Sequence, residues 1–335
     1  AVINSGNANA CAPMGEENAE RVCAAAGKAL GCRPEDVVVA ATGVIGQTLN
    51  VAVIEQGMPE LCAAAAHTAA GSDAAAHAIM TTDTVKKELA VETVIGGKTV
   101  RMGGIAKGSG MIHPNMGTML CFLTTDCAIS SEMIKSALLE TVQASFNRIS
   151  VDGDTSTNDT CCVLANGLAG NPVITEKGPD YDAFVEALRA LCVELAKKMA
   201  SDGEGATHLI TCTVTGAGSE QSAETVAKSV IGSALTKAAI FGADANWGRV
   251  LCAIGYSGAD VDVNKVELSF ESKAGVIPVC VDGAGIPFSE DIAKKVLLEP
   301  EINILIDLHD GEGKATAWGC DLTYDYVKIN GDYRT

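Results

Sequence analysis

A chain of 335 residues is long enough for one large domain or two ordinary ones, and its 47% hydrophobic content supplies an ample core. A formal net charge of -18 argues against binding to nucleic-acid phosphates. No apolar run approaches the roughly 20 residues that span a bilayer, and no basic-then-apolar leader is visible. We therefore expect a soluble cytoplasmic protein with neither nucleic-acid nor membrane partners.

The metal-binding residue types are present, but their spacing does not predict a metal site. The 13 cysteines contain no CxxC pair, and most of them lie in apolar stretches where Cys acts as a small hydrophobe. The 5 histidines show neither HxxxH nor HExxH spacing. We expect reduced, structural thiols, no metal and no cofactor.

The first third of the chain predicts helices that alternate with short strands. Residues 16–30 have helical spacing of Ala, Val and Cys and end at Gly31, as a C-cap would. Residues 37–41 predict a buried strand, and the Thr42–Gly43 turn after it could aim N–H groups and a hydroxyl into a site. An ordinary glycine turn is the alternative reading. Two further elements are expected: helical segments over 50–70 broken near Gly57 and Pro59, and a hairpin over 91–102 that turns at Gly96–Gly97.

The centre of the chain joins a loop rich in Gly, Pro and Asn to an apolar run over residues 119–123. The run predicts a buried strand, and Gly117 permits strained backbone angles immediately before Thr118. Attack of the Thr118 hydroxyl on the Gly117 carbonyl, followed by hydrolysis of the ester, would free an amine beside that hydroxyl. Such an amine activates a threonine nucleophile. From these residues alone, a loop that enters a core strand is the simpler reading.

The second half predicts a polar loop at 151–159 that lines the site, and then a smaller α+β domain. We expect a domain over residues 1–239 that bears the nucleophile and a second domain over 240–335. Helices are predicted over 130–146, 180–200, 221–241 and 289–298, a turn over 243–249, and strands over 208–214, 251–256, 263–270, 276–281, 302–308 and 316–329.

Nine blocks in matching order resemble the ornithine acetyltransferase family of arginine biosynthesis, also called the glutamate N-acetyltransferase or ArgJ family. The resemblance implies an α/β (α+β) fold with N-terminal-nucleophile-like layered sheets and helices of the ArgJ/DmpA type. Family members carry several dozen further residues upstream, so we expect a truncated N-terminus. The blocks are NSGNAN (4–9), ATGVIG (41–46), MTTDT (80–84), AKGSGM (106–111), PNMGTM (114–119), SVDGDTSTND (150–159), DGEG (202–205), ADANWGR (243–249) and NGDYRT (330–335).

The resemblance also implies roles for single residues. Thr118 would be the nucleophile, released by cleavage of the Gly117–Thr118 bond, and Thr42 with Gly43 would form the oxyanion hole. Lys107 would suit a substrate carboxylate and Glu204 a substrate amino group, although a solvated loop residue is the default reading of each. Many relatives carry Ala where this chain has Gly117. The implied substrate contacts are Thr81, Lys107, Thr118, Glu204, Asn330 and Thr335.

The implied activity is transfer of the acetyl group of N2-acetylornithine to glutamate by a ping-pong mechanism. An α chain of residues 1–117 and a β chain from 118 would assemble as an α2β2 heterotetramer. No CoA-binding signature is visible, which favours acetylornithine alone and leaves acetyl-CoA open as a second donor. Two alternatives stay open: an N-terminal-nucleophile amidohydrolase or aminopeptidase in which water is the acceptor, and an unprocessed, inactive chain.

Overall fold

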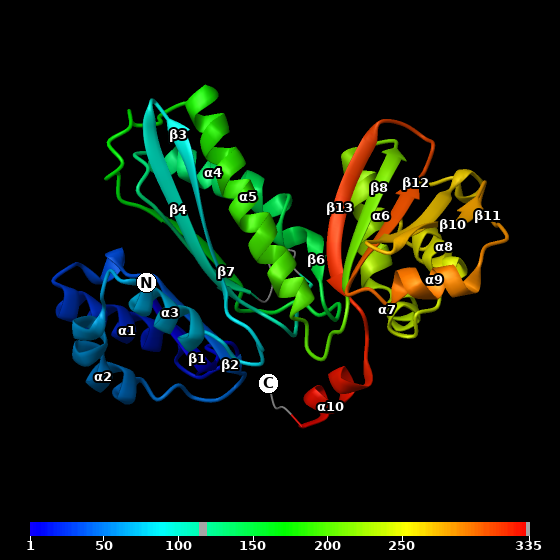
Figure 1. Ribbon diagram of the computed structural model, residues 1–335. Helices are drawn as coiled ribbons and strands as arrows, with labels where there is room; N and C mark the ends of the chain where they lie inside the picture. The colour runs from blue at the N-terminus through cyan, green and yellow to red at the C-terminus, as the bar shows by residue number, and fades with distance from the viewer. Residues whose placement is uncertain (114–118, 333–335) are drawn as a thin grey trace.

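The computed structural model describes residues 1–113 and 119–332, which form three sheets with helices packed against them (Figure 1). The N-terminal part holds two parallel strands, β1 and β2, beside three helices. Its buried side chains include Val22 of α1 and Met58 of α2. The elements of this part are β1 (Val2–Asn7), α1 (Gly15–Leu30), the 3-10 turn Pro34–Asp36, β2 (Val39–Val44), α2 (Val51–Ala64) and α3 (Ala69–Ala78).

The central sheet has the order β3-β4-β5-β7, in which β5 and β7 are parallel and the other pairs are antiparallel. The predicted hairpin turn is confirmed, because Gly96 and Gly97 both have positive φ, which glycine adopts without strain. The elements are β3 (Lys87–Ile95), β4 (Lys98–Lys107), β5 (Leu120–Thr125), α4 (Ser131–Gln143), the 3-10 turn Phe146–Arg148, β7 (Thr160–Ala165) and α5 (Pro179–Ser201).

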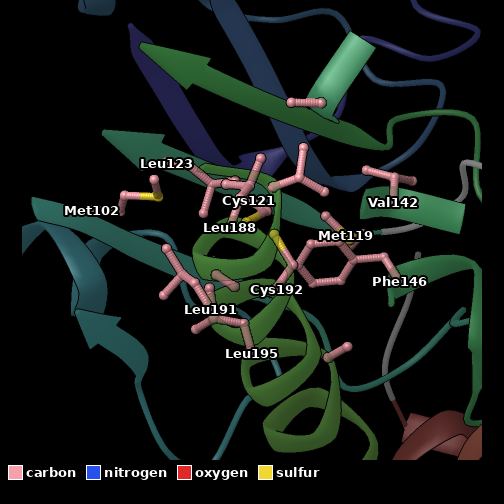
Figure 2. Packing of buried hydrophobic residues seen from close by; sticks show 14 of the residues in the cluster. Met102, Met119, Cys121, Leu123, Val142, Phe146, Leu188, Leu191, Cys192 and Leu195 are labelled. Atoms are coloured by element: carbon pink, nitrogen blue, oxygen red, sulfur yellow. The ribbon is translucent and has the colours of Figure 1, made fainter. Parts of the chain in front are cut away.

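Helix α5 packs its apolar face against this sheet. Leu188, Leu191 and Leu195 are fully buried and point toward side chains of β4 and β5 (Figure 2). Burying one such side chain contributes about 1.5–3 kcal/mol. The helix thus holds β4 and β5 together on either side of the undescribed residues 114–118.

The C-terminal sheet has the order β11-β10-β9-β12-β8-β13-β6, and its apolar cluster extends from Ile210 to Ala317. The predicted division into residues 1–239 and 240–335 stays a prediction. The elements are β6 (Ile149–Ser150), β8 (Leu209–Ala217), α6 (Glu220–Gly232), α7 (Ala234–Phe241), α8 (Trp247–Gly255), the 3-10 turn Val263–Lys265, β9 (Glu267–Ser272), β10 (Gly275–Val281), β11 (Ala284–Gly285), α9 (Glu290–Leu297), β12 (Glu301–Asp307), β13 (Gly313–Cys320) and α10 (Tyr324–Asp332).

Two of the strand predictions are wrong. Residues 251–255 lie in helix α8 and Tyr256 is its C-cap; the helix buries Val250, Ala253 and Ile254 at helical spacing. A short apolar run does not distinguish a strand from a buried helix. The predicted strand 316–329 ends at Cys320, and α10 follows, with the Thr323 hydroxyl accepting a hydrogen bond from the Tyr326 N–H.

Two helix predictions also need correction. Helix α2 continues through Gly57 and Pro59, because its buried Val51 and Met58 pack with α1 and outweigh one lost backbone hydrogen bond. The predicted helix 221–241 is two helices, because Ser233 ends α6 and its hydroxyl caps α7.

Candidate active site

A pocket of about 320 Å³ lies where the three parts of the fold meet. It is lined by the end of β2, the segment before β3, the end of β4, the 152–158 loop, Glu204 and α10. The structure brings six predicted site residues to this one pocket: Thr42, Gly43, Thr81, Lys107, Glu204 and Asn330. Gly117, Thr118 and Thr335 lie outside the described residues.

Thr42 and Gly43 reach the pocket near the end of β2, where they pair with Ser5 and Gly6; the prediction that they form a turn after the strand is wrong. Gly43 pairs with Gly6 of β1 and has a φ of +117°. A Cβ at Gly43 would overlap the backbone of Gly6. The position therefore requires glycine, both for its backbone angle and for the close approach of the two strands.

A buried charge network lies behind the wall that carries Lys107. The Lys87 side chain is fully buried, and its ammonium donates to Asp83 Oδ1 at 2.6 Å and to Asp202 Oδ2 at 2.5 Å. Asp83 also accepts hydrogen bonds from the N–H groups of Thr81 at 3.1 Å and Gly108 at 2.7 Å. The network thus fixes the backbone beside two predicted substrate contacts.

Lys107 is 4% exposed, and its ammonium lies 3.9 Å from Asp83 Oδ2. Burial lowers the pKa of Lys107, the charge of Asp83 opposes this shift, and the charge of Lys87 adds to it. The same two lysines hold the pKa of Asp83 below its usual range against the effect of burial. Lys107 is therefore a desolvated cation at the pocket wall, where an anionic ligand would be favourable.

Glu204 lies across the pocket and joins the central loop to the C-terminal helix. Its N–H donates to the Ser109 carbonyl at 2.8 Å, and its Oε2 accepts from Asn330 Nδ2 at 2.7 Å. A Cβ at Gly110 would overlap the Glu204 carboxylate. Gly110 of the AKGSGM block thus makes room for this carboxylate.

The sequence did not single out Asp152 and Tyr326 as site residues, but both line the pocket. Asp152 accepts hydrogen bonds from the N–H groups of Met111 at 2.6 Å and Ile112 at 2.9 Å, and from the Tyr326 hydroxyl at 3.3 Å. Burial and the neighbouring Asp152 carboxylate raise the pKa of Tyr326. The polar 151–159 loop was the available signal for Asp152, whereas Tyr326 fell in a predicted strand.

Asp159 is the most unusual carboxyl group near the pocket. Both of its oxygens are buried, and neither has a hydrogen-bond partner of normal geometry among the described residues. Burial raises the pKa of Asp159 to about 7, and the Met119 backbone and the Lys107 charge oppose this rise. Because Leu120 pairs with Thr160 in register, Asp159 lies beside Met119 at the start of β5.

His113, five residues before Thr118, has structural contacts. His113 Nδ1 lies 3.0 Å from the Ser150 hydroxyl, and the His113 carbonyl accepts from Thr155. Burial and then the charge of Lys228 lower the pKa of His113.

The ADANWGR block contributes to the contact between helices α7 and α8. Asn246 caps α8, and Arg249 donates to the Leu235 carbonyl at 3.0 Å. Within residues 1–113 and 119–332, no group of three potential ligands is placed to hold a metal ion. None of the described helices has both the length and the apolar character needed to cross a membrane.

Comparison with known proteins shows which family the chain resembles. The ArgJ family profile matches residues 1–335. The "Arginine biosynthesis bifunctional protein ArgJ" of Symbiobacterium thermophilum is 53% identical over all of this chain and 82% of its own length, and the Bacillus subtilis protein of the same name is 48% identical over all of this chain and 80% of its own. A crystal structure of the Bacillus halodurans protein matches with a TM-score of 0.60 at 48% identity, covering 63% of this chain and 98% of that chain. The chain therefore belongs to the ArgJ family, whose members are acetyl-transferring enzymes of arginine biosynthesis.

Proposed function

We propose that this enzyme transfers the acetyl group of N2-acetylornithine to glutamate through an acetyl-Thr118 intermediate. The observation that carries the proposal is the gathering of Thr42, Gly43, Lys107 and Glu204 around one small pocket, although 162 residue positions separate the first from the last. The pocket volume of about 320 Å³ suits an amino-acid-sized ligand. Its wall offers a cation for a carboxylate and an anion for an ammonium group.

The reaction takes place in two acyl transfers. The Thr118 hydroxyl attacks the acetyl carbonyl, its proton passes to the Thr118 amine, and the oxyanion is stabilised at Thr42 and Gly43. Collapse of the tetrahedral adduct breaks the amide bond, and the departing ornithine nitrogen takes the proton. The glutamate amine then attacks the acetyl ester, restores the Thr118 hydroxyl and leaves as N-acetylglutamate. Lys107, Glu204, Asn330, Thr81 and Thr335 would hold each amino acid in turn.

Self-cleavage at Gly117–Thr118 would create the amine that this reaction needs. The segment from Thr118 onward is 218 of 335 residues, about 65% of the chain. The matched chain of the Bacillus halodurans structure covers 63% of this chain and is itself almost wholly matched, so it is about the length of that segment. This agreement supports a β chain that begins at Thr118.

The α and β chains would stay together after cleavage, because many contacts cross the proposed cut. Strand β4 pairs with β5, Lys87 pairs with Asp202, and the Asn158 amide donates to the Ala41 carbonyl. We further propose the α2β2 assembly that the family resemblance implies. The 13 free cysteines suit a reducing compartment, which supports a cytoplasmic location.

The relatives are called bifunctional, which favours a second activity. For that activity we propose acetyl-CoA as an alternative acetyl donor to the same Thr118 hydroxyl. Its product with glutamate would again be N-acetylglutamate, with free CoA released.

An assay of acetylornithine consumption with and without glutamate separates transfer from hydrolysis. We expect consumption to require glutamate and the Thr118→Ala variant to be inactive and uncleaved, while Thr118→Ser keeps a hydroxyl and some of both activities. Consumption at the same rate without glutamate would favour the amidohydrolase alternative. A cleaved, active Thr118→Ala variant would overturn the assignment of the nucleophile.

A further inference from the structure

Lys87 has an unusual position for a lysine, because its side chain is completely buried and lies behind the pocket wall. Its ammonium donates to Asp83, Asp202 and the Val85 carbonyl, the last at 3.3 Å. A lysine ammonium has three donor hydrogens, so these three acceptors satisfy it. Buried charges of this kind are retained only when they are paired.

The two carboxylates that Lys87 joins hold different parts of the site. Asp83 accepts from the N–H groups of Thr81 and Gly108, which flank two pocket residues. Asp202, at the end of α5, accepts from the N–H groups of Thr84 at 3.0 Å and Val85 at 3.4 Å. Lys87 therefore ties the segment before β3 to the end of α5.

Lys107 competes for one of these carboxylates. Its ammonium lies 3.9 Å from Asp83 Oδ2, beyond hydrogen-bond distance, whereas Lys87 lies 2.6 Å from Asp83 Oδ1. The other negative groups that face Lys107 are Glu204 and Asp159, and Glu204 already accepts from Asn330. Asp83 thus has its close counter-ion in Lys87, and Lys107 makes no short ion pair among the described residues.

We propose that Lys87 is a positioning residue that neutralises Asp83 and thereby keeps the Lys107 ammonium available for the carboxylate of the substrate. This inference rests on the proposed function, in which Lys107 binds that carboxylate. Without Lys87, Asp83 would be a buried carboxylate whose nearest cation is Lys107. Lys107 would then move toward Asp83 and away from the ligand.

The test is a comparison of KM values for acetylornithine and glutamate in four variants of the full chain. In Lys87→Met we expect KM for both substrates to rise about tenfold or more, the effect of losing one charged hydrogen bond, with a smaller change in kcat. Adding Asp83→Asn removes the carboxylate that attracts Lys107. The double variant should therefore recover most of its KM, although its thermal stability stays low because Asp202 has lost its cation.

The remaining two variants are controls. Lys86→Met removes the neighbouring lysine, which pairs with Asp73 and Glu88 nearer the surface, and should leave KM unchanged. Asp202→Asn keeps the Asp83–Lys87 pair, so KM should stay within about twofold even if the protein is less stable. This variant keeps the test decisive if Lys87→Met fails to fold. A destabilised Asp202→Asn protein whose KM also rises about tenfold would assign the network a purely structural role.

An unchanged KM in folded Lys87→Met, or a double variant that stays as impaired as the single one, would overturn the inference. Wild-type enzyme that transfers no acetyl group would instead contradict the proposed function.

Discussion

The two sides of the pocket, divided at the proposed cleavage site, are built in different ways. The side contributed by residues 1–117 consists of strand ends and buried groups, such as Gly43 against Gly6 and Lys107 in front of Asp83. The side contributed by the later part of the chain combines the buried Glu204 with the exposed 153–155 loop and with α10, which buries none of its described residues. The first side is fixed by packing, whereas α10 on the second side is held by one hydrogen bond from Tyr326 to Asp152 and one from Asn330 to Glu204.

This difference predicts how each side tolerates substitution. A change on the first side should affect both catalysis and folding, because the same atoms serve both. A change on the second side should have a graded effect on substrate affinity. The experiments below test this contrast, from the largest expected effect to the smallest.

Gly43→Ala should have the largest effect. The new Cβ would overlap Gly6 and displace the proposed oxyanion donors, so kcat/KM should fall by about 10²–10³-fold. Gly46→Ala is the matched control: Gly46 also has a positive φ, but no described atom lies within 4 Å of its would-be Cβ. Steady-state kinetics measure kcat/KM of both variants. A Gly43→Ala variant with the kcat/KM of the wild type would show that this side is not fixed by packing.

The proposed role of Lys107 in binding the substrate carboxylate predicts that Lys107→Met raises KM for acetylornithine and for glutamate by about 10- to 100-fold. The exposed Lys98, at the other end of β4, gives the control variant Lys98→Met. KM is measured in parallel for Lys107→Met and Lys98→Met, and we expect it to rise only in Lys107→Met. An unchanged KM in Lys107→Met would leave the pocket without its assigned carboxylate site.

Asp159 tests the contact between the two sides, because it faces Lys107. Its pKa is raised from 3.8 to about 7, so at low pH it is protonated in both folded and unfolded chains and no penalty arises. As the pH rises from about 4 through 7, only the unfolded chain ionises freely, and we expect the folded protein to lose about 1–2 kcal/mol after a discount for partial exposure.

Urea unfolding near pH 4 and near pH 8 checks this shift. The free energy of unfolding of Asp159→Asn should rise relative to that of the wild type by about the same 1–2 kcal/mol at the higher pH. The exposed Asp154→Asn is the control. A difference between wild type and Asp159→Asn that does not change with pH would contradict the raised pKa.

Tyr326→Phe should have the smallest effect. It removes one hydrogen bond between α10 and Asp152, worth about 0.5–1.5 kcal/mol, so KM should rise severalfold at most. Tyr324→Phe is the control, since Tyr324 is exposed and packs its ring on Phe241. A loss of activity as large as that of Gly43→Ala would show that the second side is as constrained as the first.

Local chemistry made much of the fold predictable. Gly31 ends α1 in the left-handed conformation, and Ser130 caps α4 with its hydroxyl, both as their sequence context indicates. Residues 251–256 and 321–329 were predicted wrongly because apolar periodicity over so few residues does not determine helix or strand.

The site was predictable only where its residues belong to short sequence motifs. The family motifs predict residues that contact ligands, and six of the predicted site residues line the pocket. The Lys87 network joins groups up to 115 positions apart, and an isolated Lys in a strand looks like a solvated residue. Only the folded chain reveals that it is buried between two carboxylates.

The most direct test of the central claim is the mass of the purified, denatured protein. Two fragments, of which the larger begins at Thr118, are the result that an N-terminal threonine nucleophile predicts. A single intact chain that nevertheless transfers acetyl groups would contradict it, because Thr118 would then have no free amine to act as its base.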